Sequence, residues 1–289
     1  MNFTLNTALL SLVLTSLLPQ LSFANQLKDD KLVYDAYFPI WAQEAIDLGH
    51  QLPKPYGFSI NYMNMSQPLM VDSVGFSGLG DVIDKALSIQ GSQALQDSET
   101  LSLRGDVWLL PFLNVYGILG QTKGSSVANV QLSLAEQPIG PHFDFILDFS
   151  GISYGAGTTI VGGIGNWFGL VDVNYTKTSL DILEGAISTL VLSPRVGYRW
   201  QYNGRDLQLW GGAMYQDVEQ NFAGKLADIG VHLPAPLPST GKFKVNQGLA
   251  SNWNGLIGGQ ASVSDSIDAL LEIGFGTRSS VMLGLGYRF

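Results

Sequence analysis

Eight charged side chains lie within apolar stretches of the chain, at the alternate positions that otherwise carry small and polar residues. They are Arg104, Asp106, Asp172, Arg195, Arg199, Asp268, Glu272 and Arg288. A guanidinium can donate two parallel hydrogen bonds to one carboxylate, so these residues can form ion pairs if their stretches lie side by side. Left unpaired, such side chains attract or repel charged solutes. The chemistry to expect of them is electrostatic recognition.

Residue types that break and form bonds are scarce. The chain has no cysteine and three histidines, which lie far apart in the sequence: His50, His142 and His232. Ser150 and Ser153 follow His142, which leaves a hydrolase with a Ser–His pair as the least favoured alternative. The spacing of His142 and Asp144 is better explained by chance than by a protease dyad. The sequence predicts no enzyme, no cofactor and no metal site.

The composition narrows the class of protein. Charged residues make up 13% of the 289 residues, against about 25% in a typical soluble domain. The formal net charge is −9, which excludes a basic nucleic-acid-binding protein. No stretch reaches the roughly 18–20 continuous apolar residues of a membrane-spanning helix. With 34 glycines, the chain is poor in charge and rich in glycine without being strongly apolar.

The first 24 residues resemble a secretory signal peptide. Residues 8–18 read ALLSLVLTSLL, an apolar core, and Ser22 and Ala24, on either side of Phe23, supply small residues ahead of cleavage after Ala24. No Lys or Arg precedes the core, so only the amino terminus supplies positive charge. A short buried helix is the alternative interpretation.

The last nine residues alternate strictly. Val281, Leu283, Leu285, Tyr287 and Phe289 share one parity, and glycines and Arg288 occupy the other. A strand with one apolar and one polar face fits a wall between lipid and a polar lumen. This strand resembles the terminal strand of bacterial outer-membrane β-barrels, which ends in Phe. The resemblance implies that Tyr287 and Phe289 are read by the barrel-assembly machinery.

The same alternation recurs upstream and gives the strand count. Including the terminal strand, ten stretches qualify: 56–64, 100–109, 112–121, 151–164, 167–177, 190–200, 206–216, 251–263, 267–277 and 281–289. Twelve strands remain an alternative, because residues 70–76 and 127–134 could each form another. Short links alternate with long ones at 65–99, 122–150 and 218–250, which we expect to be outer loops. A soluble β-sandwich is disfavoured because the outward faces are apolar.

These patterns predict an all-β fold, an antiparallel transmembrane β-barrel over residues 56–289. Residues 25–55 do not alternate. They are expected to be a periplasmic or lumen segment with a short helix within 38–50. The barrel would lie in the cell outer membrane, in contact with its lipid and with no nucleic-acid partner. The oligomeric state stays open.

Two functions remain open at this point. One is a narrow passive channel for small solutes, with the eight charged residues at its constriction. The other is a non-conducting barrel whose lumen charges pair off and whose outer loops serve surface interaction or envelope integrity. An outer-membrane lipid hydrolase is less favoured than either.

Overall fold

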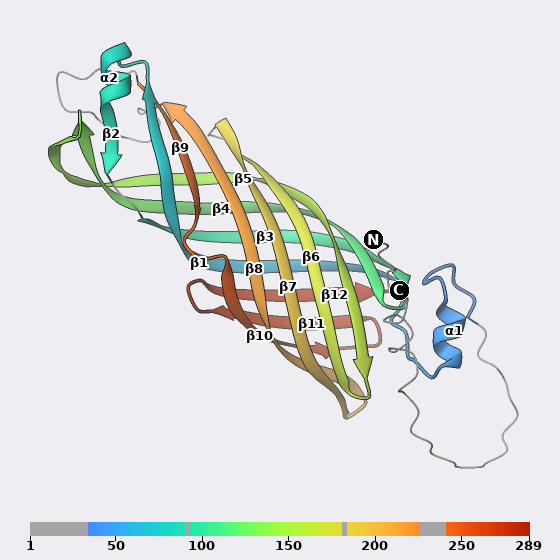
Figure 1. Ribbon diagram of the computed structural model, residues 1–289. Coiled ribbons are helices and arrows are strands. Elements are labelled where there is room, and N and C mark those ends of the chain that lie inside the picture. Colours follow the sequence, from blue (N-terminus) through green and yellow to red (C-terminus); the bar gives the residue numbers. More distant parts are fainter. Residues whose placement is uncertain (1–33, 91–92, 181–183, 226–240) are drawn as a thin grey trace, which may run out of the picture. The chain divides into compact units, whose positions relative to one another are not determined.

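The computed structural model describes residues 34–90, 93–180, 184–225 and 241–289 (Figure 1). The expected signal peptide and residues 25–33 lie outside the described residues. The chain divides into two units, Met1–Asp35 and Ala36–Phe289, and every element below belongs to the second unit. Neither helix of the described residues is long and apolar enough to cross a membrane.

Twelve strands and two helices make up the described part of that unit. The helices are α1 (Ala42–Asp47) and α2 (Asp81–Ala86). The strands are β1 (Tyr56–Ser77), β2 (Leu87–Gln90), β3 (Gln93–Leu110), β4 (Leu113–Leu134), β5 (Gln137–Ile164), β6 (Trp167–Leu180), β7 (Glu184–Tyr202), β8 (Arg205–Lys225), β9 (Lys242–Leu249), β10 (Trp253–Ser262), β11 (Ile267–Phe275) and β12 (Ser279–Arg288).

Ten of these strands close into an antiparallel ring. Each pairs with two neighbours in the order β10, β11, β12, β1, β3, β4, β5, β6, β7, β8, and β8 pairs back to β10. This closure confirms the predicted barrel of ten strands. The two further strands, β2 and β9, bring the sheet to twelve but lie outside the ring. Because closure leaves no strand edge within the ring, every ring strand can satisfy its backbone groups internally.

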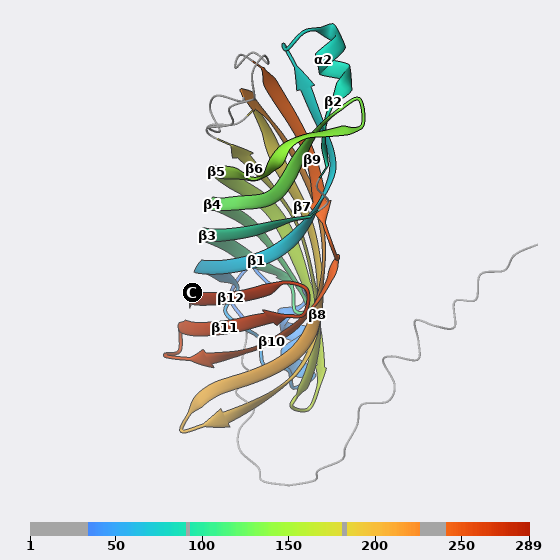
Figure 2. The same cartoon turned by 90° about the vertical axis from the view of Figure 1, so that its left-hand side faces the viewer.

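The ring has two different ends. At one, which we call the short-turn end, β5 and β6 are joined by Gly165 and Asn166, and β7 and β8 by Asn203 and Gly204. At the other, the extended end, several strands continue beyond β10–β12 (Figures 1 and 2). We call this continuation the extension; it comprises β1 from Leu69, β3 up to Gln96, β4 from Ser125, β5 up to Ser150, β7 up to Thr189, β8 from Val218, and β2 and β9.

The prediction of long loops is wrong for most of the residues concerned. β1 continues through residues 70–76 and β4 through 127–134, so neither stretch is a separate strand. β4 and β5 join at a two-residue turn, Ala135 and Glu136, whose φ angles are 49° and 65°. β9, within the third expected loop, pairs with both β8 and β1 and takes the place of β10–β12 in the extension.

The predicted loops are wrong because the alternation of apolar and polar residues reverses along the strands, so that apolar residues change from the outward to the inward positions. On β5, Ile152 and Tyr154 point outward and are about half exposed, while Ser153 is buried inside the ring. Farther along the same strand, the inward Phe145 and Leu147 are buried. Lipid favours apolar side chains outside and water favours them inside, so the reversal marks where the strands leave the membrane.

The N-terminal helix is shorter than expected. α1 covers Ala42–Asp47 rather than most of 38–50, and Trp41 before it has φ 68°. The Ile40 N–H donates a 2.9 Å hydrogen bond to the Leu109 carbonyl, close to the turn between β3 and β4. This contact ties the segment before α1 to the short-turn end.

Candidate solute chamber

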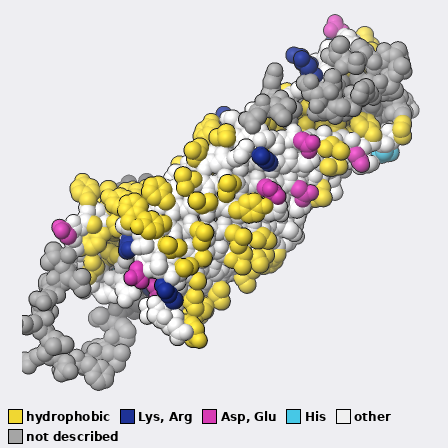
Figure 3. Space-filling view, turned by 180° about the vertical axis from the view of Figure 1, so that it is seen from behind, with side chains coloured by type: hydrophobic (Ala, Val, Ile, Leu, Met, Phe, Trp, Pro, Cys, Tyr) yellow, Lys and Arg dark blue, Asp and Glu magenta, His cyan; other side chains and the backbone are white. Residues whose placement is uncertain are grey.

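The outer surface of the ring is an apolar belt. Along β12, Val281, Leu283, Leu285 and Tyr287 are all exposed, as the alternation predicts for a lipid-facing strand. Figure 3 shows hydrophobic side chains spread over one flank, with charged side chains gathered at two levels on either side. Such a surface would be insoluble in water and is matched to hydrocarbon.

Aromatic side chains mark the short-turn edge of this belt. The Trp167 and Tyr198 rings lie 5.2 Å apart, edge to face, and Tyr198 stacks on Trp200 at 6.3 Å. Phe289 stacks on Tyr287 at 5.9 Å. Rings of this kind collect at membrane–water interfaces, because they have an apolar body and, in Tyr and Trp, a polar group.

Inside the ring lies a chamber of about 520 Å³. It reaches from Gly57 and Arg288, near the short-turn end, to Gln67, Gln96 and Gln220. Each of the ten ring strands contributes side chains to its wall. The wall is rich in Ser, Thr, Asn, Gln and charged side chains, as the inward positions of the strands predict, and methionine, leucine, isoleucine and valine side chains also line it.

One charged network lies at the short-turn half of the chamber. The Arg288 Nη2 forms a 2.7 Å salt bridge with the Asp106 Oδ2. The Asn114 Nδ2 donates to the same oxygen at 2.7 Å and accepts at its Oδ1 from the Arg104 Nη2 at 3.0 Å. The Arg104 guanidinium lies 3.5 Å above the centre of the Tyr116 ring. Arg104 is thus fixed by an amide and an aromatic ring.

A second network crosses the ring from β7 to β11. The Arg195 Nε and Nη2 donate to the two Glu272 carboxylate oxygens at 2.7 and 2.9 Å. The Trp210 Nε1 donates to the Glu272 Oε2 at 2.7 Å. Glu272 is only 4% exposed, so its charge is neutralised by a two-pronged contact rather than by solvent.

Asp172 is held by neutral groups. The Tyr116 hydroxyl donates to both of its oxygens at 2.8 Å, and the Thr159 hydroxyl donates at 2.7 Å. The Asn174 Nδ2 donates at 3.1 Å. Among the described residues, no cationic group lies within salt-bridge distance of Asp172 and no carboxylate within that distance of Arg104. Tyr116 therefore separates an unpaired cation from an unpaired anion.

Seven of the eight predicted charged residues line the chamber: Arg104, Asp106, Asp172, Arg195, Asp268, Glu272 and Arg288. Arg199 does not. Its side chain is exposed and donates to the Gly165 carbonyl at 3.4 Å, because it lies at the strand end beside the β5–β6 turn. Asp268 accepts a 3.0 Å hydrogen bond from the Ser262 hydroxyl.

Sequence reasoning missed Arg278, which also lines the chamber. It lies between β11 and β12 and is 2% exposed. Its Nη1 and Nη2 donate to the Ser251 and Asn252 carbonyls at 3.0 and 3.2 Å. Asn254 exchanges two hydrogen bonds with the Arg278 backbone. Every residue has a backbone carbonyl, so the pattern of residue types could not identify these hydrogen-bond partners.

Buried glutamines close the chamber toward the extended end. The Gln67 Nε2 and the Gln220 Nε2 both donate to the Gln96 Oε1, at 3.1 and 2.9 Å. The Gln247 Nε2 donates to the Gln220 Oε1 at 2.8 Å. We call these four side chains the glutamine layer. It links β1 and β3 with β8 and β9, and so crosses the interior.

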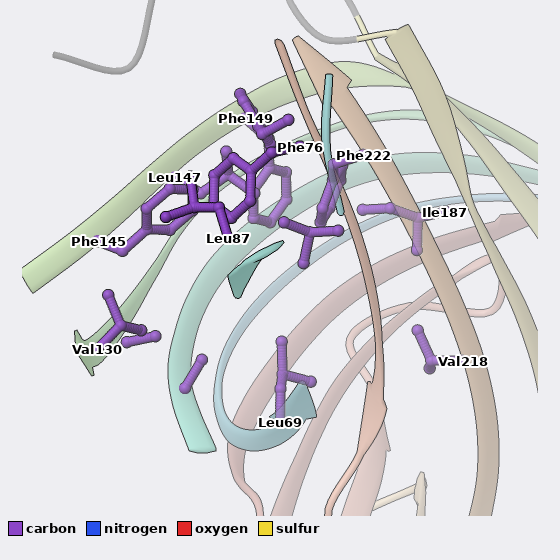
Figure 4. Close-up of a cluster of buried hydrophobic side chains, with 14 of the residues drawn as sticks. Leu69, Phe76, Leu87, Val130, Phe145, Leu147, Phe149, Ile187, Val218 and Phe222 are labelled. Carbon is purple, nitrogen blue, oxygen red and sulfur yellow. The ribbon is translucent and has the colours of Figure 1, made fainter. Parts of the chain in front are cut away.

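Beyond the glutamine layer, an apolar core fills the extension (Figure 4). Phe145 and Phe243 meet edge to face at 5.8 Å, and Phe149 stacks on Phe222 at 6.0 Å. The space left among these side chains is about 20 Å³, enough for about one water molecule. The interior is thus hollow and of mixed polarity within the ring, and apolar and filled within the extension.

No catalytic arrangement emerges around the histidine nearest to serines. His142 and Ser153 are separated along β5 by about 36 Å, at about 3.3 Å per residue. Ser153 instead exchanges hydrogen bonds with Thr122 and Thr178, both at 2.8 Å. In the part of the chain that the structure describes, no three His, Asp or Glu side chains form a metal-binding group.

Comparisons with known proteins give resemblances of fold only. No family model and no curated protein matches the sequence. Similar solved structures include the outer membrane protein OprG from Pseudomonas aeruginosa (12% identity, TM-score 0.40, covering 82% of this chain and 99% of that one). Others are the transport unit of the autotransporter AIDA-I from Escherichia coli (13%, 0.36, 81% and 90%) and the toluene transporter TbuX from Ralstonia pickettii (13%, 0.34, 82% and 90%).

At such low similarity, these proteins supply no residue correspondence, and the class follows from this chain's own geometry. The ten ring strands close without an edge, carry an apolar belt and enclose a chamber that charged and polar side chains line in part. Only closed barrels let strands satisfy their backbone groups within a bilayer. The chain is a β-barrel of the outer membrane.

Proposed function

We propose that this barrel is a narrow channel for small solutes. The observation that carries the proposal is the chamber of about 520 Å³, whose lining of polar, charged and apolar side chains comes from all ten ring strands. Chambers that hold a small molecule are typically about 300–1,000 Å³. A solute that left water for this chamber would meet amides, hydroxyls, two ion pairs and the unpaired Arg104 and Asp172, interspersed with apolar side chains, instead of lipid.

The paired charges favour passage over tight binding. Conduction requires that a solute bind well enough to enter and weakly enough to leave. Arg195 and Glu272 neutralise each other, as do Arg288 and Asp106. A small solute therefore meets few strong binding sites in the wall.

The barrier in this channel is the glutamine layer with the apolar core beyond it. A solute in the chamber reaches Gln96 and Gln220 and then the stacked rings of Phe149 and Phe222. We expect the wild-type protein to conduct rarely and in small steps, because these side chains must move apart for each passage.

Planar-bilayer recording and a solute-flux assay in liposomes test this function. The double variant Phe149→Ala, Phe222→Ala removes the stacked pair, and Ile187→Ala, Val218→Ala is a milder change at the same inner end of the chamber. The matched control is Ile152→Ala, an outward substitution in the belt. We expect flux to rise in both double variants and to stay at the wild-type level in the control. If the wild type, both double variants and the control all fold but give neither current steps nor solute flux, the proposal of a channel is wrong.

A second function has its own supporting observation. The apolar core fills the extension, as a permanently closed barrel devoted to surface interaction would require. If this is the function, trimming the core lowers stability and leaves flux at zero. The same flux assay therefore separates the two functions.

The remaining expectations stand as proposals beside the channel. We propose that the chain has no catalytic activity, since His142 and Ser153 lie far apart along β5. The apolar belt supports contact with outer-membrane lipid. The exposed Tyr287 and Phe289 at the chain end support recognition by the assembly machinery.

A further inference from the structure

Part of one strand of the extension has an edge that pairs with none of the described strands. β5 pairs with β4 from Gln137 to Ile164, but its pairing with β6 covers only Gly151–Ile164, because β6 ends at Leu180. Beyond that point, β4 and β5 continue as a hairpin (Figure 1). No strand that the structure describes pairs with the second edge of residues 143–149. A bare edge is a template for another strand.

The register shows which backbone groups face this edge. The Val161 N–H donates to the Phe112 carbonyl on the β4 side, and the register between β4 and β5 is continuous from there back to Phe143. In an antiparallel pair, successive residues direct their N–H and C=O groups to opposite sides. The odd-numbered residues of β5 therefore bond to β4, and Asp144, Ile146 and Asp148 present their backbone groups at the bare edge.

An exposed apolar row runs across the sheet and ends at this edge. Leu95 on β3, Val127 on β4 and Ile146 on β5 are direct partners in register and are 54%, 39% and 49% exposed. Toward the ring, the next outward residues in these strands are Asp97, Ser125 and Asp148. This polar row separates the apolar row from the belt, so the apolar row lies on the water side.

Aspartates flank the last residue of the row. Asp144 and Asp148 are exposed, and both lie two residues from Ile146 on the same face. Asp144 accepts a 2.9 Å hydrogen bond from the Asn129 Nδ2. A second copy of this edge, paired antiparallel at Ile146, would place Asp144 opposite Asp148 of the other copy. Like charges directly opposite are destabilising, which disfavours self-pairing.

We propose that the β5 edge over residues 143–149 binds an extended segment of a partner protein as an added strand. The segment would carry an apolar residue opposite Ile146 and Lys or Arg two positions to each side, opposite the two aspartates. Main-chain hydrogen bonds would supply affinity, and the charged and apolar pairs would supply the sequence preference. The extension, and not the chamber, is the binding surface, so the proposal is independent of the channel.

Peptide binding to the full barrel, folded in detergent, tests this inference. The probe is a labelled peptide, Thr-Lys-Thr-Val-Thr-Lys-Thr, and its N-methylated form cannot donate the hydrogen bonds of an added strand. Fluorescence anisotropy should show binding of the first peptide and at least about tenfold weaker binding of the second. Equal binding of the two peptides would overturn strand addition.

Two protein variants make the test specific to this edge. Ile146→Pro removes one edge-facing N–H without removing a hydrogen bond to β4, and it should weaken binding of the Lys peptide about tenfold. Asp144→Lys, Asp148→Lys should lose the Lys peptide and gain its Asp counterpart. The matched control Asp97→Lys makes the same change two strands away and should leave binding nearly unchanged. Binding that falls equally in Asp97→Lys, or that persists in Ile146→Pro, would contradict the proposal.

Folding of the variants is checked by far-ultraviolet circular dichroism and by the mobility of unheated protein in gels. If Ile146→Pro does not fold, the charge-swap pair and the N-methylated peptide still decide the question. Binding of the extension to anionic lipid vesicles in preference to the Lys peptide would also overturn a protein partner.

Discussion

Arg195 and Glu272 join two walls of the barrel. They lie on β7 and β11, which are separated in the ring by β8 and β10, and are linked by hydrogen bonds of 2.7 and 2.9 Å. Trp210 on β8 adds a third bond to the same carboxylate. The contact fixes the chamber wall by spanning strands that are not neighbours, and it keeps both charges from competing for a solute.

Glu272→Gln should strongly destabilise the barrel. The change leaves the Arg195 guanidinium buried without an anion, and breaking a buried pair in this way costs about 3–5 kcal/mol. Arg195→Met with Glu272→Leu removes both charges and should cost less than Glu272→Gln alone. Urea unfolding followed by tryptophan fluorescence measures both variants. Equal losses would show that the unpaired charge is not the cause.

Arg104 and Asp172 should set ion selectivity in opposite directions. Neither has a charged partner within salt-bridge distance among the described residues, so each projects its charge into the chamber. In the Phe149→Ala, Phe222→Ala background, Arg104→Gln should shift the reversal potential in a KCl gradient toward cation selectivity. Asp172→Asn should shift it toward anion selectivity. Arg199→Gln, outside the chamber, serves as the control, and shifts of the same sign in the first two variants would be inconsistent with this assignment.

Phe289→Ala should weaken closure between the first and last strands. The Phe289 ring stacks on Tyr56 at 5.8 Å and on Phe58 at 6.0 Å, and both partners lie on β1. Each aromatic pair contributes about 0.5–1.5 kcal/mol beyond its buried area. We expect a lower unfolding midpoint and a smaller folded fraction in refolding assays. Tyr202→Ala, an exposed aromatic away from the β1–β12 pair, should leave both nearly unchanged.

Arg278→Lys should loosen the loop between β9 and β10, although it keeps the charge. The guanidinium reaches two carbonyls, of Ser251 and Asn252, with two different nitrogens, whereas an ammonium is a point donor. Hydrogen exchange should rise in residues 250–254 and stay unchanged in the β5–β6 turn. Exchange that matches the wild type in both regions would show that the two bonds do not hold the loop.

The ring could be predicted from the sequence because lipid imposes a simple rule on it. Each lipid-facing position must be apolar, so Val281, Leu283 and Leu285 define a strand without any knowledge of its neighbours. All ten predicted stretches lie within ring strands or overlap them closely. The seven charged residues in the chamber share the opposite parity for the same reason.

The extension could not be predicted from the same rule. Once β5 leaves the membrane, its inward positions carry apolar residues such as Phe145 and Leu147, and its outward positions carry polar residues such as Asp144. This is the reverse of the pattern expected for a strand in lipid. The glutamine layer depends on which strands meet across the interior, and that is set by register. Arg278 binds carbonyls that any residue could supply. The apolar core, the glutamine layer and Arg278 together determine where the chamber ends. Their positions depend on which strands and backbone groups meet in the fold, which the residue types alone do not show.

The most direct test of the account is whether solute passes through the chamber itself. The chain has no cysteine, so Ser102→Cys, which faces the chamber, and Leu103→Cys, which faces lipid, can each carry the only thiol. Both are placed in the Phe149→Ala, Phe222→Ala background and treated with a charged, membrane-impermeant thiol reagent during bilayer recording. If solute passes through the chamber, current should fall on modification of Ser102→Cys and stay unchanged for Leu103→Cys. Current that is unaffected by modification at Ser102→Cys would contradict passage through the chamber.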